Sequence, residues 1–110
     1  MRLNNIELPM DQVKAFCDRW QVAEFALFGS VLRDDFRADS DIDVMVSFLP
    51  DAHPTLFTLV DMKEELQSLF EHEVDLVTRG GIENSRNPYR RNQILSTAKT
   101  IYEQGRSVSV

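Results

Sequence analysis

The chain has 110 residues, of which 43% are hydrophobic, enough for one modest core and not for two. A formal net charge of −6, from 18 acidic and 12 basic residues, argues against a protein that holds nucleic acid mainly through phosphate contacts. A single cysteine excludes internal disulfides and cysteine-rich metal sites. Because no apolar run reaches the roughly 18 residues of a membrane span and the first residues lack a signal-peptide pattern, we expect a cytoplasmic protein.

The first half of the chain alternates helical and strand patterns. After Pro9, an amphipathic helix of about three turns is predicted by apolar residues at helical spacing: Val13, Phe16, Cys17 and Trp20. Residues 22–28 predict a strand, and a short helical piece is expected from Ser30 to about Asp35. Residues 41–48 predict a second strand that ends before Pro50.

The middle of the chain continues this alternation. Pro54 opens a longer helix in which apolar residues recur with a period near 3.6 as far as Phe70. Residues 74–77 predict a third strand, and the pair Gly80-Gly81 predicts a break.

The last third begins with another helix, at Asn87-Pro88. Residues 100–102 form either a short fourth strand or the end of that helix, and residues 106–110 are expected to be a flexible tail. No repeat or linker interrupts the pattern. The alternation therefore predicts one domain over 1–110 with an α/β or α+β layer structure.

The most informative motif is Gly29-Ser30, ten residues, then Asp41-Ile42-Asp43. A glycine lets the backbone approach a phosphate closely, and the Ser30 hydroxyl at the start of a helical turn favours an anion. Successive side chains of a strand point to opposite faces, so Asp41 and Asp43 point the same way while Ile42 faces the core. Two carboxylates on one face can share a divalent cation, and this pattern indicates nucleotidyl transfer.

A third carboxylate is expected at Asp75. Two-metal phosphoryl chemistry uses carboxylates that hold ions about 3.5 to 4 Å apart. Asp75 lies between Val74 and Leu76 in a predicted strand, where an unpaired charge is costly to bury. A metal would explain its position, and pairing with a basic neighbour is the alternative.

These residues carry a family resemblance. The string Phe28-Gly-Ser-Val-Leu-Arg33, followed by Ala38-Asp-Ser40-Asp-Ile-Asp43, resembles the DNA polymerase beta-like nucleotidyltransferases. Among these it is most similar to the minimal nucleotidyltransferases that are encoded beside HEPN-domain proteins as toxin–antitoxin pairs. The resemblance extends from Phe25 to Tyr102.

The resemblance implies an α+β, two-layer fold, a small mixed sheet with helices packed on one side. It implies Mg²⁺, with two ions expected, at Asp41 and Asp43, and a base or third ligand at Asp75. It also implies ATP as the donor, bound by Gly29, Ser30, Arg33 and Ser40. The implied reaction is transfer of AMP to a tyrosine hydroxyl of a HEPN-family toxin ribonuclease, which the chain, as the antitoxin, would thereby neutralise.

The chain departs from the family pattern next to Arg33. Family members commonly carry glycine there, whereas this chain has Asp34 and Asp35, and it has Ala38 where proline is common. We expect the added negative charge to affect catalytic efficiency more than the fold. Arg33 itself either contacts phosphate or pairs with a neighbouring aspartate.

Other interpretations compete with this one. An EF-hand fails because Val44 and Pro50 occupy the positions of its glycine and its terminal glutamate. A non-catalytic antitoxin that occludes its toxin remains an alternative. Transfer to RNA or to a small molecule is less favoured, because we expect no added domain to bind such a substrate and find no basic tract for RNA. His53 and His72 are expected on the surface. A cluster of arginines is interpreted as a solvated helix face or a partner contact: Arg86, Arg90 and Arg91.

Overall fold

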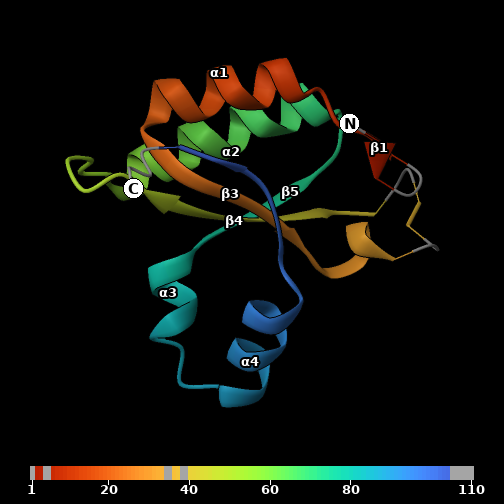
Figure 1. The fold of residues 1–110 in the computed structure, drawn as a ribbon, viewed down its shortest axis with the longest axis vertical. Coiled ribbons are helices and arrows are strands. Elements are labelled where there is room, and N and C mark those ends of the chain that lie inside the picture. The colour runs from red at the N-terminus through yellow and green to blue at the C-terminus, as the bar shows by residue number, and fades with distance from the viewer. Residues whose placement is uncertain (1, 4–5, 34–35, 38–39, 105–110) are drawn as a thin grey trace.

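The computed structural model describes the whole chain except residues 1, 4–5, 34–35, 38–39 and 105–110 (Figure 1). The expectations for Asp34, Asp35 and Ala38, and for the tail over 106–110, therefore lie outside the described residues. The architecture is a mixed β-sheet with helices, which confirms the α+β class.

A four-stranded sheet forms the centre of the molecule, in the order β5-β4-β3-β6. Its strands are β3 (Val22–Phe28), β4 (Ile42–Phe48), β5 (Val74–Thr78) and β6 (Lys99–Glu103). Only β4 and β5 pair in parallel, because the helix between them crosses over the sheet. The three predicted strands are confirmed, and the ambiguous segment near the end is a strand. A separate pair, β1 (Arg2–Leu3) with β2 (Ile6–Glu7), was not predicted.

Two long helices, α1 (Met10–Trp20) and α2 (Leu56–Phe70), lie together over one face of the sheet (Figure 1). Both confirm the predicted amphipathic helices. In α2 the first turn is held by Thr55, whose hydroxyl accepts from the Thr58 backbone N–H at 3.2 Å. Among the described residues, no helix is long and apolar enough to cross a bilayer.

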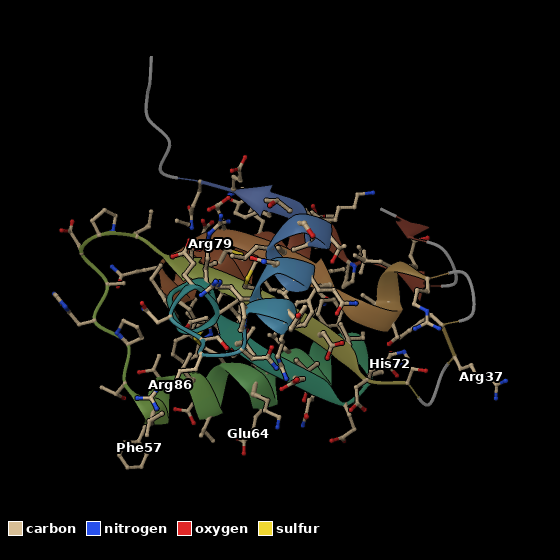
Figure 2. All side chains as sticks on the ribbon, turned by 90° about the horizontal axis from the view of Figure 1, so that it is seen from below. Arg37, Phe57, Glu64, His72, Arg79 and Arg86 are labelled. Carbon is tan, nitrogen blue, oxygen red and sulfur yellow. The ribbon has the colours of Figure 1, made fainter. Side chains whose placement is uncertain are left out.

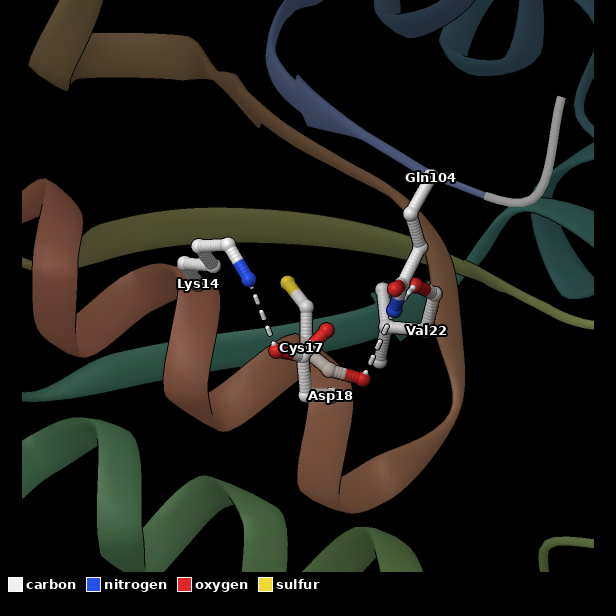
Figure 3. Close-up of polar contacts among 5 residues, drawn as sticks. All are labelled: Lys14, Cys17, Asp18, Val22 and Gln104. Atoms are coloured by element: carbon white, nitrogen blue, oxygen red, sulfur yellow. Dashed lines mark hydrogen bonds and ion pairs between the residues drawn. The ribbon is translucent and has the colours of Figure 1, made fainter.

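The turn from α1 into β3 is fixed by Gln104, the residue that follows β6 (Figure 3). Its side-chain amide donates to the carbonyl oxygens of Cys17 and Val22, at 3.1 and 2.7 Å. Cys17 is fully buried, and burial raises the pKa of its thiol to about 12, with a smaller contribution from Asp18. The thiol is therefore a packing group and stays protonated at neutral pH.

Two short helices, α3 (Arg79–Glu83) and α4 (Pro88–Thr97), lie on the opposite face of the sheet (Figure 1). Helices therefore cover both faces, and the expectation that they pack on one side is wrong. The predicted break at Gly80-Gly81 is wrong, because both glycines lie inside α3. The Thr78 hydroxyl accepts from the Gly81 N–H at 3.0 Å and so caps the helix that the glycines alone would disfavour. The predicted start of α4 is confirmed, with Asn87 as its cap.

The sheet strands alternate between these two faces. From β3 and β4, one set of side chains packs under α1 and α2: Val22, Phe25, Leu27, Ile42, Val44 and Val46. The other set packs against Ile82 and Ile94 of the short helices: Ala26, Phe28 and Met45. The sheet therefore has two different environments, and Asp43 and Asp75 of the predicted site lie on the second.

Candidate active site

Gly29 begins a single 3₁₀ turn, η1 (Gly29–Leu32), at the end of β3. This turn is shorter and tighter than the helical piece expected from Ser30 to Asp35, and the backbone is already extended at Arg33. Gly29 has φ +75°, and a Cβ there would collide with Oδ2 of Asp43. Only glycine permits this close approach of the turn to the carboxylate.

Asp43 and Asp75 are directly opposite each other in the parallel register of β4 and β5. Their neighbours Ile42 and Val74 are buried under α1 and α2, so both carboxylates leave the sheet on the other face. The prediction that Ile42 faces the core is confirmed. Asp41 lies one residue before β4 and is exposed.

The carboxyl group of Asp43 carries an unusual charge environment. Its pKa is raised to about 6, first by partial burial and then by the negative charges of Asp75 and Asp41. The Arg90 guanidinium acts in the opposite direction and lowers this pKa. The site therefore holds more negative charge than its own cations offset, which a bound cation would relieve.

A cavity of about 370 Å³ lies between the carboxylates and α4. Its sheet wall is formed by Phe28, Gly29, Asp43 and Asp75. Its helix wall is formed by Arg90, Gln93, Ile94 and Thr97. A negative wall thus faces a polar wall that carries a positive charge.

The structure brings together three of the predicted site residues at this cavity, namely Gly29, Asp43 and Asp75. Four others do not line it: Ser30, Arg33, Ser40 and Asp41. The Ser30 hydroxyl lies 3.4 Å from the backbone oxygen of Asp41, so η1 and the start of β4 are in contact. Asp41 is close enough to influence the charge of Asp43.

Ser40 is engaged in the loop before the site. Its hydroxyl accepts from the Arg37 N–H at 3.3 Å, and its carbonyl oxygen lies 3.2 Å from Nδ1 of His72. His72, expected on the surface, is half-buried with its ring against Phe36 at 5.4 Å between centroids. His72 and Arg37 lie on one side of the molecule in Figure 2. This contact ties the loop to the end of α2.

The helix wall was missed by sequence reasoning. Arg90 was interpreted as a solvated or partner-binding cation, and Gln93 and Thr97 were not singled out. Their spacing offered a signal, because residues 90, 93, 94 and 97 fall on one helical face with Ile94 as the buried anchor.

The donor chemistry of the site fits a hard divalent cation. Asp41, Asp43 and Asp75 supply oxygen ligands of the kind that Mg²⁺ prefers, and the raised pKa of Asp43 marks a negative charge that a cation would stabilise. As the described side chains stand, no group of three or more His, Cys, Asp or Glu residues converges tightly enough to hold a metal. A bound cation would therefore have to draw these carboxylates closer together.

Comparison with known proteins agrees with this geometry. The sequence profile of the nucleotidyltransferase domain matches residues 10–101. The candidate protein adenylyltransferase MJ1379 of Methanocaldococcus jannaschii is 35% identical over 81 residues, which cover 74% of this chain and 78% of that protein. The protein adenylyltransferase MntA of Thermococcus cleftensis is 32% identical over 71 residues, which cover 64% of this chain and 70% of MntA.

Solved structures extend the comparison to the fold. A candidate minimal nucleotidyltransferase, 32% identical, superposes with a TM-score of 0.62 over 81% of this chain and 85% of its own. Two toxin–antitoxin complexes share the fold at lower identity. A chain of one, crystallised with AMP-PNP, gives a TM-score of 0.67 at 18% identity over 89% of this chain and 76% of its own.

The other complex joins a tri-AMPylated HEPN toxin of Shewanella oneidensis to its MNT antitoxin. Its matching chain gives a TM-score of 0.58 at 17% identity over 86% of this chain and 69% of its own. The sequence matches carry the family assignment, and the fold and the carboxylates beside Gly29 agree with it. The chain therefore belongs to the nucleotidyltransferase domain family and is a nucleotidyltransferase of the minimal kind.

Proposed function

We propose that this nucleotidyltransferase uses Mg²⁺ to transfer AMP from ATP to a hydroxyl group, most directly a tyrosine, of a HEPN-family toxin ribonuclease, and so neutralises it. The observation that carries the proposal is the cavity lined by Gly29, Asp43 and Asp75. In it, Asp43 packs closely against Gly29 and is paired in register with Asp75 on the neighbouring strand. Relatives that are named protein adenylyltransferases support the reaction class. A structural neighbour that contains an AMPylated HEPN toxin supports the partner class.

The roles of the residues follow from their positions. Asp41, Asp43 and Asp75 would hold Mg²⁺, which when bound neutralises charge on the phosphates and on the leaving group. Asp75, exposed at the cavity, accepts the proton of the acceptor hydroxyl. The acceptor oxygen forms a bond to the α-phosphorus of ATP, the bond to the bridging oxygen breaks, and pyrophosphate leaves toward Gly29 and Ser30.

The nucleotide site extends beyond the cavity lining in this proposal. Arg33 and Ser40 follow η1 in the chain, and in this proposal they contact the phosphates of the bound nucleotide. The reaction takes place in the cytoplasm, where ATP is available. The partner supplies both the acceptor hydroxyl and the remaining substrate surface, since positioning contributes much of the rate in phosphoryl transfer.

A second candidate is favoured by the net charge of −6. An acidic protein can cover the basic RNA-binding cleft of a ribonuclease and silence it by occlusion, without chemistry. The two functions differ in whether the partner becomes covalently modified.

The test is incubation with labelled ATP and Mg²⁺, with and without the protein encoded by the neighbouring gene, followed by intact-mass measurement of both chains. We expect one or more AMP units on the partner. The double variant Asp41→Asn with Asp43→Asn abolishes the adduct. The matched double variant Asp51→Asn with Asp61→Asn changes two exposed carboxylates away from the cavity and keeps it.

The outcomes separate the two functions. An adduct that depends on Asp41 and Asp43 supports transfer. A partner that is bound and silenced with no change of mass, including by the double variant, refutes transfer and supports occlusion.

A further inference from the structure

The helix wall of the cavity carries a cation, Arg90, that no hydrogen bond or ion pair to the described residues holds in place. Among the described residues, the Arg90 guanidinium forms no hydrogen bond or ion pair. Other arginines are engaged: Arg19 pairs with Glu65 at 2.8 Å, Arg79 pairs with Glu83 at 3.1 Å, and Arg91 donates to the Ser85 carbonyl at 3.3 Å. Arg90 is the only Lys or Arg among the residues that line this cavity.

The position of Arg90 is unfavourable for the free helix. Pro88 is the first residue of α4, so Arg90 lies in the first turn, where the helix dipole disfavours a positive charge. The backbone N–H groups of Tyr89 and Arg90 are already occupied by the Asn87 side chain, at 3.1 and 3.2 Å. The capacity of this end of α4 to bind an anion therefore rests on the guanidinium.

The ligand that fits between the two walls is an anion accompanied by a cation. On its own, the carboxylate wall repels a phosphate chain, because it presents the carboxylates of Asp43 and Asp75 to the cavity. Arg90 lines the same cavity from α4, so its positive charge faces these carboxylates. A guanidinium presents several N–H donors in a fixed plane and binds phosphate oxygens with two hydrogen bonds at once.

We propose that Arg90 binds the phosphate chain of the nucleotide, so that α4 forms the second wall of the nucleotide site. This inference rests on the proposed use of a nucleoside triphosphate at the carboxylates. Gln93 and Thr97 lie on the same face of α4 as Arg90 and also line the cavity. The nucleotide is then held between the sheet and α4, with Mg²⁺ on one side and Arg90 on the other.

The test measures nucleotide binding separately from transfer. The purified full chain is titrated with ATP and Mg²⁺ by calorimetry, as wild type, Arg90→Gln and Arg90→Lys. Arg86→Gln is the matched control, because Arg86 is exposed, precedes α4 and does not line the cavity (Figure 2). The same proteins are titrated with AMP, and their thermal unfolding is followed by circular dichroism.

We expect Arg90→Gln to weaken ATP binding by about 10-fold or more, the loss typical of a charge-assisted hydrogen bond. Arg90→Lys should recover part of the affinity, and Arg86→Gln should bind as the wild type does. AMP has a single phosphate group, so its affinity should change less. Unfolding temperatures should change little, since the guanidinium forms no hydrogen bond or ion pair with the described residues.

Other results would overturn the inference. Wild-type ATP affinity in Arg90→Gln, an equal loss in Arg86→Gln, or a wild-type chain that binds no ATP with Mg²⁺ would each contradict it. Failure of the proposed transfer is distinguishable, because a chain that binds ATP through Arg90 and modifies no partner leaves this inference intact and refutes the transfer.

Discussion

The two faces of the sheet differ in what they bury. Sixteen of the described buried residues form one apolar cluster that joins α1 and α2 to the sheet, whereas five form a second cluster that joins the sheet to the short helices. The first face includes aromatic contacts of Phe25 with Phe16 and Phe70. The second face leaves a cavity of about 370 Å³ with two carboxylates in its lining.

This difference shows how a small chain supports a charged site. A half-buried carboxylate with raised pKa costs stability, and packing on the other face of the same strands compensates for that cost. Because strand side chains alternate, β4 contributes Ile42 and Val44 to one face and Asp43 to the other. Substitutions on the two faces should therefore have separable effects on activity and on stability.

The largest expected effect is that of Asp43→Asn, which should affect activity and stability in opposite directions. Removal of a metal-binding carboxylate should lower AMP transfer by at least about 10³-fold, because cation-dependent charge stabilisation is worth several kcal/mol. The unfolding temperature at pH 7.5 should rise by a few degrees, because the unfavourable charge is gone. Transfer assays and thermal melts measure the two effects.

The gain in stability should depend on pH. The pKa of Asp43 is about 6 when folded, above its ordinary value of 3.8, so ionisation lowers the stability of the wild type as pH rises through this interval. The difference in unfolding temperature between Asp43→Asn and the wild type should be largest above pH 6 and should shrink toward pH 4. A constant difference across that range would contradict this account.

A matched pair of aliphatic truncations compares the two faces directly. Leu66→Ala, at a fully buried position of α2, should lower the free energy of unfolding by about 4 kcal/mol and leave the activity per folded molecule unchanged. Ile94→Ala, beside the cavity on α4, should cost about 2 kcal/mol and should reduce ATP binding. Urea unfolding and calorimetry measure these quantities, and equal effects of the two variants on ATP binding would refute the separation of the faces.

The last prediction concerns the contact between Gly29 and Asp43. Gly29→Ala should cost about 3 kcal/mol of stability, since it combines backbone strain at φ +75° with a collision against the carboxylate. In an Asp43→Ala background, the new Cβ at position 29 meets only the Cβ at position 43, at 3.6 Å. The cost of Gly29→Ala should then fall to about 1 kcal/mol, which is backbone strain alone.

Gly80→Ala is the control for this experiment. A Cβ at Gly80 meets nothing within 4 Å and lies in a helix, so this change should be neutral or slightly stabilising. Additive costs in the double variant of Gly29 and Asp43 would show that the two residues do not interact.

Most of the layer structure could be predicted, because the periodicity of apolar residues shows which face of each helix or strand is buried. The period near 3.6 identified α1 and α2, and the apolar strands β3 and β5 were found within one residue of their observed bounds. The placement of Ile42 in the core and of Asp43 on the opposite face of β4 followed from the alternation of these two residues, whereas Asp41 lies one residue before the strand. These signals are local, and tertiary contacts reinforce them.

The parts that were missed depend on contacts distant in sequence or on caps. Helix α3 includes two glycines and still forms, because Thr78 caps it and Ile82 is buried. In the sequence, the adjacent glycines predict a break more strongly than the cap and the single apolar residue predict a helix. On α4 the polar residues that line the cavity look like a solvated surface until the helix is packed on the sheet. The half-buried position of His72 likewise depends on Ser40 and Phe36, more than 30 residues away in the chain.

The buried thiol of Cys17 offers a direct way to observe opening of the packed face. With a pKa of about 12 and no exposed surface, it should not react with a thiol reagent while the fold is closed. Because it is the one cysteine of the chain, each modified molecule reports one opening event at the α1–β3 turn that Gln104 fastens. The labelling rate therefore measures the opening of this half of the molecule, with no probe added to the cavity side.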